Sequence, residues 1–125
     1  MTDDDMVPGR SMEADLTAWG RVITLETQGR RSGLPRRVSV GFVSEGGNDL
    51  LVAAGDADTH WAQNLIAEPR CRVELAGVRS RRRAELLGDE ERRATVNGLI
   101  LKYGTPAERL GAGPAFRLTL TEHDD

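Results

Sequence analysis

Four arginines and a serine surround a short glycine turn in residues 29–37, which read Gly-Arg-Arg-Ser-Gly-Leu-Pro-Arg-Arg. The guanidinium group of arginine is a planar fork of donors that binds phosphate or carboxylate oxygens in pairs. Gly29 and Gly33 allow the backbone to turn tightly and to expose its N–H groups. These residue types at this spacing predict a site for an anionic small molecule, although runs of charge are often no more than a solvated turn.

The remainder of the chain is acidic, so the positive turn is a local feature. The formal net charge is −3 over 125 residues, which argues against general nucleic-acid binding by a strongly basic domain. A chain of this length and ordinary apolar content is typical of one soluble domain. We expect a disordered acidic tail over residues 1–10 and a single domain over residues 11–125.

The sequence offers no disulfide and no metal-binding pattern. Cys71 is the single cysteine, and no Cys/His spacing typical of a metal site occurs. We expect Cys71 to be a buried strand residue and the site to contain no metal. Because the N-terminal residues lack the order of a signal peptide and no apolar run has membrane-spanning length, we expect a cytoplasmic protein without an integral membrane segment.

Apolar alternation and turn residues predict six strands in hairpins, with short helices between them. The strands are expected at residues 21–27, 36–44, 49–54, 71–75, 78–87 and 115–121. The helices are expected at residues 11–19, at residues 60–67 with Thr59 as N-cap, and at residues 89–103. Short connections favour antiparallel pairing, and burial of the apolar faces favours a small β-barrel decorated by helices.

A second basic run, Arg79-Ser80-Arg81-Arg82-Arg83, lies within one predicted strand. Alternation places Arg79, Arg81 and Arg83 on one face, and we expect them to form cross-strand ion pairs with acids such as Glu74 and Glu85. Extension of an anion-binding groove by Arg82 is an alternative. RNA binding is less favoured because no aromatic stacking residues surround the run.

Two blocks of the sequence resemble the deazaflavin-dependent nitroreductase family, which uses coenzyme F420 on a split β-barrel related to FMN-binding barrels. The first block is residues 27–36, Thr-Gln-Gly-Arg-Arg-Ser-Gly-Leu-Pro-Arg, and the second is residues 61–65, Trp-Ala-Gln-Asn-Leu, followed by Ala67-Glu68-Pro69. The order and separation of the blocks also match, and the resemblance extends from about Val22 to about Leu87. It implies an antiparallel split β-barrel, mainly β with short flanking helices.

The resemblance also implies roles for individual residues. The turn would hold the phosphate and acidic tail of F420, the next strand would line its ribityl chain, and backbone at residues 53–55 would contact the ring. The implied cofactor-binding residues are Arg30, Arg31, Ser32, Arg36, Arg37, Val38, Ser39, Ala53, Ala54, Gly55, Trp61 and Asn64. Tyr103 falls near the substrate-side tyrosines of the family and is the expected catalytic residue. His60, at a helix start, is expected to be an exposed first-turn residue.

The implied function is a reductase that transfers a hydride from reduced F420 to a small electron-poor acceptor, such as a nitroaromatic, a quinone or an enone. The alternatives are a non-catalytic binder of F420 or of an apolar ligand such as a fatty acid, and an FMN-dependent reductase. A homodimer is an open possibility. The loop at residues 55–60 departs from the family because it is short and contains Asp56 and Asp58, which would repel an anionic cofactor unless they face solvent.

Overall fold

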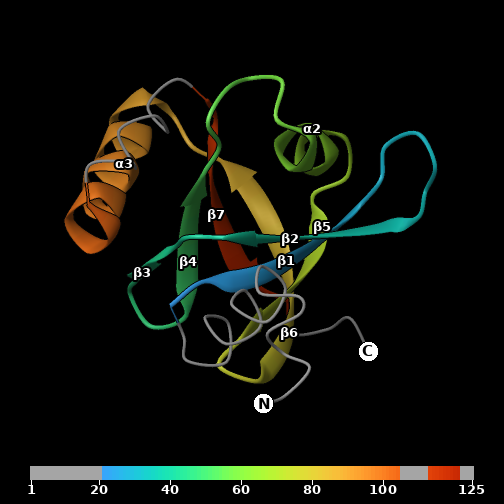
Figure 1. Cartoon of the computed structure of the whole chain (residues 1–125), viewed down its shortest axis with the longest axis horizontal. Coiled ribbons are helices and arrows are strands. Elements are labelled where there is room, and N and C mark those ends of the chain that lie inside the picture. The colour runs from blue at the N-terminus through green and yellow to red at the C-terminus, as the bar shows by residue number, and fades with distance from the viewer. Residues whose placement is uncertain (1–20, 105–112, 122–125) are drawn as a thin grey trace, which may run out of the picture.

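The computed structural model describes residues 21–104 and 113–121, which form an antiparallel sheet and two helices (Figure 1). The elements are β1 (Ile23–Gln28), β2 (Pro35–Val40), β3 (Val43–Glu45), β4 (Asp49–Ala53), α2 (His60–Ala67), β5 (Arg70–Leu75), β6 (Val78–Leu86), α3 (Asp89–Tyr103) and β7 (Ala115–Leu120). The predicted tail and the predicted first helix lie outside the described residues.

The seven strands form one sheet in the order β2-β1-β5-β6-β7-β4-β3, and every neighbouring pair is antiparallel. The two ends of this order, β2 and β3, are consecutive in sequence, so the sheet must curl until its ends approach each other. The result is a half-barrel, which confirms the predicted mainly β architecture of the split-barrel kind.

One predicted strand is two strands in the structure. The expected strand at residues 36–44 is interrupted at Gly41 and Phe42, between β2 and β3. The Phe42 N–H donates to the Tyr103 hydroxyl over 3.0 Å, and the Tyr103 ring lies so close to Gly41 that a Cβ there would be 2.9 Å from it. The packing of α3 therefore redirects the chain from one end of the sheet to the other.

The sheet has a core on each of its faces. The inner face packs Ile23, Leu25, Val52, Phe116 and Leu118 together with α2. On the outer face, α3 packs over β3, β4 and β7. The core there consists of Leu51, Ala53, Leu87, Val96, Leu99 and Ala115. The outer face of β2, β1, β5 and β6 is not part of either core.

The two helices agree closely with their predicted bounds, but one cap differs. Thr59 is the N-cap residue of α2, yet its side chain makes no capping hydrogen bond. Its hydroxyl instead accepts from the Asp56 N–H over 3.3 Å, which closes the preceding loop. The helix α3 begins with Asp89, Glu90 and Glu91, where negative charge is favourable to the helix dipole.

Cys71 is buried, as predicted, and burial raises the pKa of its thiol to about 12. The second basic run is partly as predicted: Arg79 pairs with Glu74 at 3.5 Å, whereas Glu85 pairs with Arg117 at 3.1 Å. Arg82 is buried and donates to the carbonyl oxygens of Asn48 and Leu118, so it does not extend a groove. No helix within residues 21–104 and 113–121 is long and apolar enough to cross a membrane.

Candidate functional site

The arginine turn between β1 and β2 is held by its own backbone. The Gly29 N–H donates to the Leu34 carbonyl and the Gly33 N–H to the Gly29 carbonyl, each over 2.8 Å. Gly33 has a φ of +75°, a conformation that favours glycine. At Gly29, by contrast, there is no room for a side chain. A Cβ at Gly29 would lie 2.8 Å from the Ser32 Oγ and 3.1 Å from the Leu34 carbonyl oxygen. The two glycines therefore serve different purposes in one turn.

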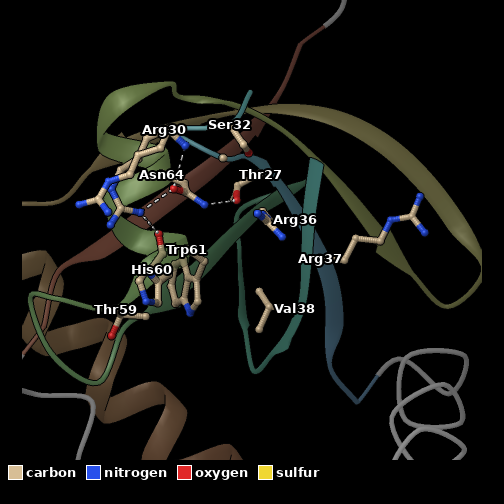
Figure 2. A pocket seen from close by; sticks show the side chains of 12 residues that line it. Thr27, Arg30, Ser32, Arg36, Arg37, Val38, Thr59, His60, Trp61 and Asn64 are labelled. Atoms are coloured by element: carbon tan, nitrogen blue, oxygen red, sulfur yellow. Dashed lines mark hydrogen bonds between the residues drawn. The ribbon is translucent and has the colours of Figure 1, made fainter. Parts of the chain in front are cut away.

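A cavity of about 610 Å³ lies between this turn, strand β2 and the start of α2 (Figure 2). It brings together residues that are more than twenty positions apart in sequence. Its lining comprises Thr27, Gly29, Arg30, Arg31, Ser32, Arg36, Arg37, Val38, Thr59, His60, Trp61 and Asn64. Eight of the twelve predicted cofactor-binding residues are in this lining: Arg30, Arg31, Ser32, Arg36, Arg37, Val38, Trp61 and Asn64.

Strand alternation separates the residues predicted on β2. Arg36 and Val38 pair in register with the inward residues Thr27 and Leu25 of β1, so they face the cavity. Arg37 contributes to the lining, but its side chain extends away from the other labelled residues (Figure 2) and its Nε lies 2.9 Å from a carboxylate oxygen of Glu26. Ser39 shares the outward face with Arg37 and does not line the cavity.

Asn64 connects the turn to α2. Its side-chain oxygen accepts from the Arg30 Nη1 over 2.8 Å and from the Arg30 backbone N–H over 3.2 Å. Its amide nitrogen donates to the Thr27 Oγ1 over 3.1 Å, and both Asn64 and Thr27 are buried. Arg30 Nη1 also reaches the His60 carbonyl oxygen at 3.5 Å. The network fixes the position of a guanidinium group at the mouth of the cavity.

Trp61 belongs to both the core and the cavity. Its indole packs against Phe116 with ring centroids 6.0 Å apart and an interplanar angle of 55°, and it is partly buried against the inner core. Its remaining surface lines the cavity beside Val38. It therefore supplies an apolar wall against which a flat ring could lie.

The charge of the cavity is strongly positive. Its lining contains Arg30, Arg31, Arg36 and Arg37, and it contains no aspartate or glutamate. Asp56 and Asp58 are exposed and outside the lining. The Asp56 carboxylate accepts from the Asp58 N–H over 2.8 Å, so it stabilises the loop that leads into α2. The two acids in this loop do not face the arginine-lined space.

Four lining residues were not among the predicted binding residues: Thr27, Gly29, Thr59 and His60. Thr27 could have been found from alternation, because it shares the inward face of β1 with Leu25. His60 is exposed in the first turn of α2, as expected, but this position also borders the cavity. Thr59 has no signal in the sequence beyond its place before the helix.

The remaining predicted residues lie elsewhere. Ala53 and Ala54 are buried, Gly55 is half-exposed, and none of the three lines the cavity. Ala54 donates its N–H to the Pro114 carbonyl over 2.9 Å, so the backbone here joins β4 to the segment before β7.

Tyr103 also lies outside the cavity lining. Its hydroxyl donates to the Arg21 carbonyl over 2.5 Å and accepts from the Phe42 N–H over 3.0 Å. Burial raises the pKa of this phenol above its ordinary value, and the contact with Phe42 opposes that change. In the described part of the chain the hydroxyl is thus occupied by backbone groups of two segments.

Fold and cavity together define a class: a half-barrel protein with a cationic site for an anionic ligand that has a flat apolar part. Comparison with known families is more specific. The model of the F420H(2)-dependent quinone reductase family matches residues 9–106. The chain belongs to this family, so it is an F420-dependent oxidoreductase and F420 is its cofactor.

Solved structures share the fold at low sequence identity. An F420-H2 dependent reductase, FDR-A, is 24% identical with a TM-score of 0.65, over 78% of this chain and 93% of that chain. A structure described as a domain-swapped dimer is 24% identical with a TM-score of 0.63, over 94% and 99%. The heme storage protein HutZ from Vibrio cholerae is 17% identical with a TM-score of 0.60, over 93% and 90%. No curated protein matches the sequence.

Proposed function

We propose that the cavity between the arginine turn and α2 binds F420 and that the protein reduces a small electron-poor acceptor there. The observation that carries this proposal is a cavity of about 610 Å³ whose lining includes Arg30, Arg31 and Arg36 but no acid, with Trp61 on one side. A phosphate and a carboxylate-bearing tail require positive charge, whereas a ring requires an apolar wall. This lining fits both requirements.

The proposal assigns each part of the lining a task. Arg30, Arg31 and Arg36 hold the anionic part of the coenzyme, and Arg30 does so from a position fixed by Asn64. Trp61 and Val38 border the ring and exclude water from one of its faces. When bound and reduced, the coenzyme supplies a hydride to an acceptor. Tyr103 is left out of this machinery because its hydroxyl is used elsewhere.

The proposed acceptors are quinones, nitroaromatics and activated enones. Each contains an electron-poor atom that can accept a hydride, and the reduced product then takes up a proton. The family name makes a quinone the first acceptor to test. His60 is the one imidazole among the residues that line the cavity, so it is the side chain proposed to exchange a proton with the acceptor.

A fluorescence titration with F420, with FMN alongside, tests the binding part. We expect Arg36→Ala to weaken F420 binding about tenfold or more, since a charge-assisted contact contributes about 1.5–3 kcal/mol. Arg37→Ala is the matched control: Arg37 borders the cavity, but its guanidinium group is paired with Glu26, so its removal should change the affinity less than about twofold. Equal losses in the two variants, or preferential binding of FMN, would contradict the proposal.

Oxidation of reduced F420 by a quinone, a nitroaromatic and an enone tests the catalytic part. Turnover with at least one acceptor is expected. Tight binding of F420 without turnover of any acceptor would instead indicate a carrier of the coenzyme. The proposal also includes a homodimer, supported by the domain-swapped dimer among the structural neighbours, and a molar mass from light scattering tests it.

A further inference from the structure

A second hollow lies on the outward side of the sheet, away from the F420 cavity. It measures about 260 Å³ and lies over β1, β5 and β6, with one residue of β2 at its border. Its lining comprises Thr24, Glu26, Arg37, Arg72, Val73, Glu74, Arg79, Ser80 and Arg81. Arg37, on the edge strand β2, borders both sites, whereas the other lining residues lie on opposite sides of the sheet, as the alternation of Glu26 with the inward Thr27 shows.

Arginine stands opposite arginine on this face. Arg72 of β5 pairs in register with Arg81 of β6, and the next outward pair is Arg70 with Arg83. Directly opposed like charges destabilise a pair of strands. On its other side Arg72 stands opposite Glu26 of β1, but the carboxylate of Glu26 is hydrogen-bonded to Arg37, so the repulsion between Arg72 and Arg81 is only partly offset.

The acids of the hollow are already engaged. Glu26 pairs with Arg37 at 2.9 Å, and Glu74 pairs with Arg79 at 3.5 Å. Arg72 and Arg81 form no ion pair with any residue in the ranges 21–104 and 113–121, and both are exposed. The lining of the hollow thus has an excess of two positive charges, four arginines against two glutamates, within a chain whose formal net charge is −3.

We propose that this hollow binds the dianionic group of a phosphate monoester, with Arg72 and Arg81 as its two forks. Opposed residues of antiparallel strands have Cα atoms about 5 Å apart, so both guanidinium groups can reach one compact anion. A phosphate has several terminal oxygens and two charges on one centre, which suits two forked donors better than two separated carboxylates. Arg72 and Arg81 do not line the F420 cavity, so the two sites share no arginine that is proposed to hold a ligand.

Thermal unfolding with added inorganic phosphate, and separately with glycerol phosphate, tests this proposal. The measurements use Arg36→Ala protein, so that phosphate binding in the F420 cavity is weakened, and sodium chloride at equal ionic strength is the reference. We expect a saturable rise in the unfolding temperature with both phosphates. Adding Arg72→Ala and Arg81→Ala should raise the apparent dissociation constant at least about tenfold. Adding Arg93→Ala, an exposed arginine on α3, should not.

The same variants give a second readout without ligand. If the two arginines exist to bind an anion, their removal relieves repulsion, and the double variant should unfold at the same or a higher temperature than its parent. A lower unfolding temperature would assign them a structural role and overturn the proposal. A phosphate effect that survives in the double variant, or a stronger effect of succinate than of phosphate, would overturn it too.

Discussion

Neighbouring arginines in this protein have different surroundings because a strand alternates. Arg36 faces the cavity, whereas the Arg37 side chain turns outward to Glu26 (Figure 2). In the sequence, Val38 and Val40 alternate with Arg37 and Ser39. The separation of Arg36 from Arg37 could therefore be predicted from this pattern. A resemblance to a family assigns a continuous stretch to a site, but only alternate residues of a strand can face it.

Substitution of Asn64 should strongly affect the position of Arg30 at the mouth of the cavity. Asn64→Leu keeps the size of the side chain but removes the bonds to Arg30 and Thr27. Because buried groups then lose their partners, we expect unfolding in urea to become easier by about 1–3 kcal/mol and F420 binding to weaken.

Ile66→Ala, at a half-exposed position of the same helix, is the control for Asn64→Leu and should change both quantities less. Unchanged F420 affinity in Asn64→Leu would show that the position of Arg30 does not depend on this amide.

Tyr103→Phe separates packing from catalysis. The substitution keeps the ring against Gly41 but removes the hydrogen bonds with Arg21 and Phe42. We expect a loss of about 1–2 kcal/mol in the free energy of unfolding, with unchanged turnover in the folded enzyme. Unchanged stability with slower acceptor reduction would instead support the catalytic role that the family resemblance implies.

The Tyr103 phenol also predicts a pH dependence. Its pKa is raised in the folded state by burial, so the folded protein retains this proton more strongly than the unfolded chain. The contribution to stability is fully present below the unfolded pKa of about 10 and is lost as the pH rises through the folded value. The difference in stability between wild type and Tyr103→Phe, measured by urea unfolding, should therefore decrease in this alkaline range. A difference independent of pH would contradict this.

At the scale of elements, one arginine joins α3 to three strands. Arg117 of β7 lies within 3.1 Å of carboxylate oxygens of Glu45, Glu85 and Glu91, and its side chain is only 17% exposed. Its hydrogen bonds lower the pKa of Glu45, and the acids raise the pKa of Arg117. The group therefore fixes the helix against β3, β6 and β7.

Arg117→Leu should lower the free energy of unfolding at neutral pH by about 1–2 kcal/mol, since it leaves three carboxylates close together without a cation. Glu45 contributes to this effect at pH values above the pKa of its carboxyl in the unfolded chain. Because its pKa is lower in the folded protein, this contribution is lost as the pH falls from the unfolded pKa through the folded one. Urea unfolding at neutral and acidic pH measures both. An effect that grows toward acidic pH would contradict the assignment.

Sequence reasoning predicted the elements well where each is determined by its own residues. The helix at residues 60–67 and the hairpins follow from local pattern, and both agree with the structure. The break at Gly41 could not be predicted in this way, because it depends on Tyr103, which is more than sixty residues away. The prediction that backbone at residues 53–55 contacts the cofactor came from the resemblance alone; in the structure the Ala54 N–H donates to the Pro114 carbonyl.

Over the whole molecule, one curled sheet carries two cationic sites, one on each face. The chain has an excess of negative charge, so the attraction of an anionic ligand must come from arginines near the ligand. Such attraction acts over about 8 Å at physiological ionic strength and is screened at higher salt.

The affinity for F420 should therefore fall several-fold as sodium chloride rises from about 50 mM to about 500 mM, because Arg30, Arg31 and Arg36 line the cavity and its lining contains no acid. Arg36→Ala should reduce this salt dependence, since one of the attracting charges is gone. Arg72→Ala should leave it nearly unchanged, because that arginine lies on the other face of the sheet. Fluorescence titrations at several salt concentrations measure all three slopes. If affinity did not depend on salt, or if both variants changed the slope equally, contacts with the ring and its apolar wall would have to dominate binding instead of the arginine turn.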